Sequence, residues 1–170
     1  MIELSTVIAL LLILVGVVVP RVVTWEQSNR EREFWGSLNR LPSIARETAI
    51  RTGETVRLRL SDDQSQLVIQ QDSANPNEPD ATPTTVKSLS LVSGATANVF
   101  RKGTQDSQSN DWEVTFYSDG TSNGGGVTLV LNEQTRSLNV DRRGFGEAIR
   151  GPLPEAQEEN WPAGEYEKRA

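Results

Sequence analysis

The sequence predicts an α+β protein in which one long N-terminal helix packs against an antiparallel β-rich head. Three patterns support this prediction. Residues 2–19 form an almost uninterrupted apolar run, residues 21–52 repeat their apolar positions at helical spacing, and from Val56 onward apolar and polar residues alternate. The first two patterns are typical of helices and the third of strands. A chain of 170 residues accommodates one membrane segment and one domain of ordinary size.

The apolar run predicts a membrane-spanning helix at residues 1–20. Glu3 is the only ionisable side chain between Ile2 and Val19, and the run is just long enough to cross a bilayer core of about 30 Å. A cleaved signal peptide is the alternative, but it has a shorter apolar region, a basic stretch before it and a small-residue cleavage site after it. Because this segment has none of these features, we expect the helix to be retained.

Residues 21–52 are predicted to continue the helix into the head. One stripe carries apolar residues at intervals of four, three, four and four, namely Phe34, Leu38, Leu41, Ala45 and Ala49. Charged residues occupy the opposite face, namely Arg30, Glu33, Arg40, Glu47 and Arg51. Pro42 is expected to kink or locally break the helix, because proline lacks an amide hydrogen. Gly53 is the expected stop.

Residues 53–150 are predicted to form the β-rich head. Val56, Leu58 and Leu60 alternate with arginines, as in a half-buried strand. Further strand-length runs lie at residues 67–69, 89–92, 98–100, 112–117, 127–131 and 138–140. Residues 71–85 combine three prolines with Asn, Asp and Ser and predict an exposed loop. Residues 151–170 lose all apolar periodicity and predict a flexible acidic tail.

Composition excludes several classes of function. The chain has no cysteine and no histidine, so disulfides and the commonest zinc and iron ligands are missing, and we expect no metal and no cofactor. The formal net charge of −6 argues against a nucleic-acid partner, because phosphates are bound mainly by Lys and Arg. No glycine-flanked nucleophile or concentrated pair of acids is present, so we do not expect an enzyme.

Two separated parts of the sequence resemble one family. Ile2, Glu3 and Leu4 open an apolar helix, and Pro20 follows Glu3 by seventeen residues, as in type IV pilins and type II secretion pseudopilins. In the head, residues 45–51 (ARETAIR) followed by Gly53, and residues 114–125 (VTFYSDGTSNGG), resemble the GspH/FimT-type minor pseudopilins. Together these matches cover most of the chain outside the predicted loop and tail.

The resemblance implies a pilin-like fold, with a β-sandwich of two antiparallel sheets against the amphipathic half of the helix. It also implies a function, that of a minor pseudopilin in the periplasmic pseudopilus of type II secretion or a related type IV pilus system. The implied partners are other major and minor pseudopilins, the inner membrane and a secreted protein substrate. The motifs are shared by secretion and pilus systems and do not separate the two.

The resemblance places a single-pass helix in the inner membrane and the head in the periplasm. The positive-inside rule alone would place the head in the cytoplasm, because Arg21, Arg30 and Arg32 follow the helix. Members of the family carry a short basic leader, whereas this sequence begins inside the motif at Met1. A leader upstream of Met1 would reverse the charge count. The alternative is a copy that the prepilin peptidase does not process.

Glu3 and Pro20 are the candidate assembly residues. An ionised carboxylate within a bilayer costs about 2.5–3.5 kcal/mol, so it normally has a partner or a purpose. One hypothesis is that Glu3 snorkels to the nearby interface. In the family, the corresponding glutamate pairs with the N-terminal amine of a neighbouring subunit, which relieves the burial cost. Pro20 corresponds to a place where pilin helices are often melted, although Pro and Gly are also tolerated in ordinary membrane helices.

The head carries a glycine-rich turn with Asp119, Gly120, Gly124 and Gly125. The turn lacks the Lys and Ser/Thr order of a phosphate-binding loop and precedes a strand instead of a helix. It also lacks the regular oxygen-ligand spacing of a calcium loop. We therefore expect a structural turn.

Arg142, Arg143 and Arg150 support an alternative function. Some FimT-like minor pilins bind DNA through a basic C-terminal Gly-Arg-x-Arg motif during DNA uptake. The sequence here is DRRGFG at residues 141–146, which does not match that motif, and acidic residues crowd the tail. DNA binding is therefore the lesser hypothesis.

Overall fold

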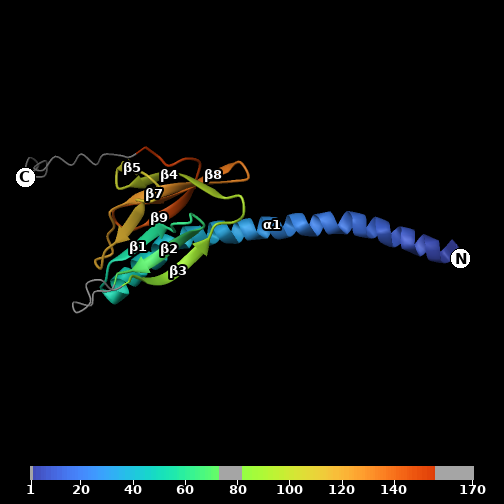
Figure 1. The fold of residues 1–170 in the computed structure, drawn as a ribbon, viewed down its shortest axis with the longest axis horizontal. Helices are drawn as coiled ribbons and strands as arrows, with labels where there is room; N and C mark the ends of the chain where they lie inside the picture. Colours follow the sequence, from blue (N-terminus) through green and yellow to red (C-terminus); the bar gives the residue numbers. More distant parts are fainter. Residues whose placement is uncertain (1, 73–81, 156–170) are drawn as a thin grey trace, which may run out of the picture.

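The computed structural model describes residues 2–72 and 82–155, and before Ser28 it describes side chains only at residues 4, 6–8 and 10–12. Helix α1 (Ile2–Thr52) is followed in this part of the chain by nine strands. Figure 1 shows α1 leaving the head as a long rod, with its C-terminal half lying among the strands. Among the described residues, no helix combines the length and the apolar character that a membrane span requires.

The helix α1 continues without interruption through Pro20 and Pro42. At about 1.5 Å per residue, its 51 residues extend over about 75 Å. The break expected at Pro42 is therefore absent. Pro42 is buried, and a Cβ at Gly146 would lie only 2.4 Å from Cγ of the proline ring. Close packing of the ring on this glycine stabilises the helix and offsets part of the cost of the missing amide hydrogen.

The predicted apolar stripe of α1 is confirmed. Its five residues, Phe34, Leu38, Leu41, Ala45 and Ala49, are at most 4% exposed, whereas the charged residues predicted for the opposite face are exposed. Trp35 is also buried, and the guanidinium of Arg136 lies 4.7 Å from the centre of its ring. The helix ends at Thr52, and Gly53, with φ of 74°, follows it.

The strands form two antiparallel sheets. The first sheet has the order β3–β2–β1–β6, with bounds β3 (Thr84–Ser90), β2 (Gln66–Gln71), β1 (Val56–Leu60) and β6 (Glu113–Phe116). The second has the order β5–β4–β7–β8–β9, with bounds β5 (Gln105–Ser107), β4 (Thr96–Lys102), β7 (Gly125–Leu131), β8 (Gln134–Val140) and β9 (Gly146–Arg150).

One core lies between α1 and the two sheets. The helix packs on β1 of the first sheet and on β9 of the second. Alternate residues of the strands complete the core, and Leu58, Val114, Leu129 and Leu138 are fully buried. The predicted fold class is therefore confirmed: a long helix packs on two antiparallel sheets in an α+β fold.

Several strand boundaries differ from the expectation. The strand expected at residues 89–92 is β3, which begins at Thr84 and ends at Ser90. The loop expected at residues 71–85 overlaps the last residue of β2 and the first two residues of β3, and its central residues 73–81 lie outside the described part of the chain. Strands β5 and β9 were not predicted, because their short sequences, QDS and GEAIR, show no run of alternating large apolar residues.

Candidate functional site

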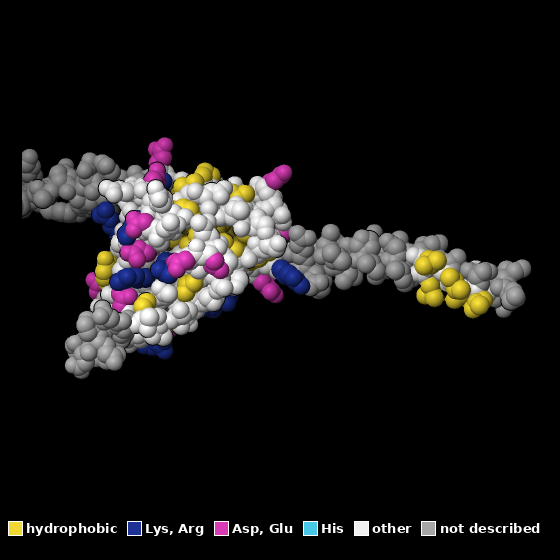
Figure 2. All heavy atoms as spheres, viewed as in Figure 1, with side chains coloured by type: hydrophobic (Ala, Val, Ile, Leu, Met, Phe, Trp, Pro, Cys, Tyr) yellow, Lys and Arg dark blue, Asp and Glu magenta, His cyan; other side chains and the backbone are white. Residues whose placement is uncertain are grey.

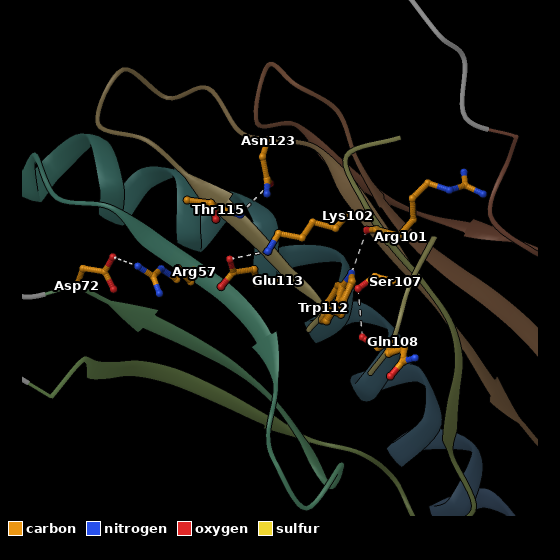
Figure 3. A network of polar contacts seen from close by, with 10 residues as sticks. All are labelled: Arg57, Asp72, Arg101, Lys102, Ser107, Gln108, Trp112, Glu113, Thr115 and Asn123. Atoms are coloured by element: carbon orange, nitrogen blue, oxygen red, sulfur yellow. Dashed lines mark hydrogen bonds and ion pairs between the residues drawn. The ribbon is translucent and has the colours of Figure 1, made fainter. Parts of the chain in front are cut away.

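The glycine-rich turn covers the outer edge of β6. The amide of Asn123 donates to the carbonyl of Thr115 (3.1 Å), and the Asn123 side chain accepts from the Thr115 amide (2.9 Å). The amide of Tyr117 donates to the carbonyl of Thr121 (2.9 Å). Figure 3 shows Asn123 reaching Thr115 from the turn. The turn therefore satisfies backbone groups that an edge strand would otherwise leave open.

Asp119 shapes the turn from within. Its Oδ1 accepts hydrogen bonds from the hydroxyl (2.6 Å) and the amide (2.8 Å) of Thr121. These bonds, the side-chain bond first, lower the pKa of Asp119, because they stabilise the charged form. Gly120 follows with φ of 82°, a conformation that L side chains rarely adopt. Both residues thus shape the local structure of the turn.

Gly124 and Gly125 carry the chain from the first sheet to the second. Gly124 has φ of 71°, and its carbonyl accepts from the amide of Gly103 (3.0 Å). Gly125 has φ of 142°, and a Cβ there would lie 2.4 Å from the carbonyl oxygen of Arg101. Any side chain at residue 125 would therefore separate β7 from β4.

Arg46 joins the glycine-rich turn to α1. Its Nε donates to the carbonyl of Gly120 (2.9 Å), and its guanidinium lies 4.5 Å from the centre of the Phe145 ring. Phe145 belongs to the turn between β8 and β9. In the same turn, a Cβ at Gly144 would lie 2.4 Å from the Gly120 carbonyl oxygen. The helix, the glycine-rich turn and the β8–β9 turn therefore meet around one side chain, which we call the Arg46 junction.

A shallow groove of about 530 Å³ lies beside the Arg46 junction. Its lining includes Ile50 and Phe145, whose side chains are 49% and 60% exposed. No pattern in the sequence predicts these contacts. Arg46 and Ile50 lie within the ARETAIR segment that carried the resemblance, but nothing in their spacing indicates which turn they touch.

The three candidate DNA-binding arginines do not form one cluster. Arg142 and Arg143 lie in the β8–β9 turn, at the rim of a cavity of about 630 Å³ that is also lined by Asp141 and Glu155. Arg150 lies at the other end of β9, opposite Arg136. Five strand residues separate the two ends by about 13 Å. Within the described residues, the basic charge is thus divided and partly matched by carboxylates.

Polar contacts join the two sheets at a second place. Lys102 of β4 forms an ion pair of 2.9 Å with Glu113 of β6, and this hydrogen bond raises the pKa of Lys102. The indole Nε1 of the neighbouring Trp112 donates to the carbonyl of Arg101 (3.1 Å). Figure 3 shows both contacts. Both contacts join β4 of the second sheet to β6 of the first sheet or to the residue before it. The described residues contain no group of His, Cys, Asp or Glu side chains able to hold a metal ion.

The side chains of Glu3 and Pro20 lie outside those that the structure describes. Most of the described side chains between these two residues are aliphatic and exposed. Leu4, Leu10 and Leu12 are 68%, 63% and 68% exposed, and Figure 2 shows an apolar surface at the far end of α1. The head itself carries interspersed acidic and basic side chains on the face shown.

A family model described as Type II transport protein GspH matches residues 37–144, well over half of the chain. The chain belongs to the GspH family. The matched region contains α1 from Ser37 onward, Arg46 with its partner Gly120, and the glycine-rich turn. The GspH family comprises structural subunits, not enzymes, and its members are minor pseudopilins of the type II secretion system. No curated protein matches the chain.

Solved structures agree with the GspH fold. The minor pseudopilin EpsH from the type 2 secretion system of Vibrio cholerae is 15% identical, with a TM-score of 0.50, over 72% of this chain and 95% of that chain. The type IV minor pilin FimU of Pseudomonas aeruginosa is 16% identical, with a TM-score of 0.51, over 75% and 92%. At these identities the likeness concerns the fold. GspH-family membership implies assembly with other pseudopilins, and such subunits are typically anchored in the inner membrane with a periplasmic head.

Proposed function

We propose that this GspH-family chain is a single-pass inner-membrane subunit that enters a periplasmic pseudopilus through the N-terminal half of α1. The observation that carries the proposal is the apolar surface of that half. Large aliphatic side chains there are half to two-thirds exposed, namely Leu4, Val7, Ile8, Leu10, Leu11 and Leu12. A soluble monomer rarely exposes such a contiguous apolar surface. Lipid before assembly, and neighbouring helices after it, would cover these side chains.

Glu3 gives this assembly its register. A carboxylate among apolar residues loses hydration, and it regains a favourable interaction only when an opposite charge meets it in the same low-dielectric environment. The N-terminal amine of a neighbouring subunit supplies such a charge. A helix that slid by one turn would leave both charges unpaired, so the pair favours one axial position of each subunit in the fibre.

The experiment compares Glu3→Ala with Glu33→Ala, which removes an exposed carboxylate from the head-proximal part of the same helix. Each full-length variant is produced with the other pseudopilins of its secretion system, and membrane insertion and co-purification are measured. We expect Glu3→Ala to insert normally and to lose co-purification, whereas Glu33→Ala retains both. Normal co-purification of Glu3→Ala would overturn the proposal.

DNA uptake is not the function that we propose. The net charge is −6, and Arg142 and Arg143 lie in the β8–β9 turn, whereas Arg150 lies at the far end of β9. Salt-sensitive binding of duplex DNA by the full chain, lost on replacing Arg142 and Arg143, would reverse this ranking.

A further inference from the structure

The two sheets have four edge strands, namely β3, β6, β5 and β9. In the described part of the head, three of these edges are either covered or short. The glycine-rich turn pairs with the edge of β6. Helix α1 reaches the edge of β9, where Asn39 Oδ1 accepts from the amide of Ala148 (2.9 Å). Strand β5 has only three residues. Strand β3 differs, because it has seven residues and, within residues 2–72 and 82–155, pairs only with β2.

Within the part of the chain that the structure describes, the side of β3 away from β2 leaves the backbone groups of Ser88 and Ser90 without a partner strand. Just beyond the strand, the amide of Leu91 donates to the carbonyl of Ser65 (2.8 Å) and so points toward the β2 side. Backbone groups of an antiparallel strand alternate in direction. The N–H and C=O groups of Leu89 therefore face β2, whereas those of Ser88 and Ser90 face away from it. Most of the side chains of β3 are exposed as well, and Figure 1 shows β3 at the border of the head.

The charge on β3 distinguishes between two possible partner strands, which are the β3 strand of a second copy of this chain and an acidic strand of a different protein. Lys87 lies at the centre of the strand, is exposed, and is the only charged residue of Thr84–Ser90. If two copies of the chain paired their β3 strands antiparallel with full overlap, Lys87 would lie directly opposite Lys87 of the second copy. Like charges in such positions oppose pairing, and opposite charges favour it. The strand is therefore protected against self-association and suited to an acidic partner strand.

We propose that β3 is a strand-addition site, which binds an extended segment of a different protein with Asp or Glu opposite Lys87. Main-chain hydrogen bonds to Ser88 and Ser90 would extend the first sheet by one strand, and the carboxylate would fix the register. This inference rests on the proposed function only in naming another pseudopilus subunit as the source of the segment. Its chemistry is testable without the fibre.

The test uses the full chain in detergent micelles and two nine-residue peptides of alternating threonine and valine. One peptide has glutamate at its centre and the other has lysine. Binding is measured by fluorescence anisotropy, and the site is located by amide hydrogen exchange at Ser88 and Ser90. We expect the glutamate peptide to slow exchange of both amides and to bind about fivefold more tightly than the lysine peptide.

Three variants make the result specific to this edge. Lys87→Glu should reverse the preference between the two peptides. Ser88→Pro removes an outward amide without removing a donor to β2, so it should abolish binding, and Ser88→Ala keeps that amide and should bind normally. Absence of binding at millimolar peptide, unchanged binding by Ser88→Pro, or peptide-independent dimerisation through β3 would each overturn the proposal. None of these outcomes depends on Glu3, so failure here is distinguishable from failure of the proposed function.

Discussion

The contact between the glycine-rich turn and the β8–β9 turn leads to a quantitative prediction for Gly144→Ala. Gly144 has φ of 76°, and an added Cβ would lie 2.4 Å from the Gly120 carbonyl oxygen and 3.0 Å from Cδ of Arg46. The carbonyl belongs to the backbone of a tightly hydrogen-bonded turn, so it cannot rotate away as a flexible side chain would. The two turns must move apart for the methyl group to fit.

The magnitude separates into two contributions. An L residue in the left-handed region costs about 1–2 kcal/mol, and forcing an extra methyl group into a packed site costs about 1–3 kcal/mol more. Gly94 has a similar φ of 86° but nothing within 4 Å of an added Cβ. Gly94→Ala therefore carries only the first contribution. We expect Gly144→Ala to lower the free energy of unfolding by about 2–5 kcal/mol and Gly94→Ala by about 1–2 kcal/mol.

The assay is urea unfolding of the full chain in detergent, followed by the fluorescence of the buried Trp35 and Trp112. Linear extrapolation gives the free energy of unfolding of each variant, with equal m-values as the check that the same transition is measured. If the two alanine variants unfold within about 0.5 kcal/mol of each other, the contact between the turns does not contribute as argued.

Two further predictions concern the head. Arg46→Met should lower the free energy of unfolding by about 1–3 kcal/mol, because it removes a charged hydrogen bond and a ring contact. The control Arg51→Met replaces an exposed arginine and should change this free energy by under about 0.5 kcal/mol. Equal losses in the two variants would contradict a stabilising role of the Arg46 contacts. Hydrogen bonds from Ser61 and then Ser65 lower the pKa of Asp63 from 3.8 to about 2. Its stabilisation should therefore be present above about pH 4 and vanish as the pH falls through about 2, so the difference in unfolding midpoint between wild type and Asp63→Asn should shrink over that range.

The sequence allowed prediction of elements whose residues carry a regular period. The stripe from Phe34 to Ala49 and the alternation from Val56 to Leu60 are confirmed by complete or near-complete burial. In both cases the period of the backbone places every apolar side chain on one face, so the pattern is a direct record of what is buried. The sequence of strand β9 shows no such alternation. Its strand conformation depends on pairing with β8, which local sequence does not reveal.

The expected break at Pro42 was wrong for a tertiary reason. Local chemistry opposes proline within a helix. Only the folded head supplies Gly146, whose missing side chain leaves room for the proline ring against β9. A similar limit applies to Arg46, since a partner 74 residues away cannot be inferred from the spacing of neighbours.

By itself, the sequence determined the long helix, its buried stripe, the β-rich head and the family, because each depends on local period or on short motifs. The tertiary structure alone decided how the glycine-rich turn is used. It covers the edge of β6, crosses between the sheets and meets α1 at Arg46. It also decided that β3 remains open in the described part of the chain. Edges and junctions arise from long-range pairing, and no local pattern encodes which strand is left without a neighbour.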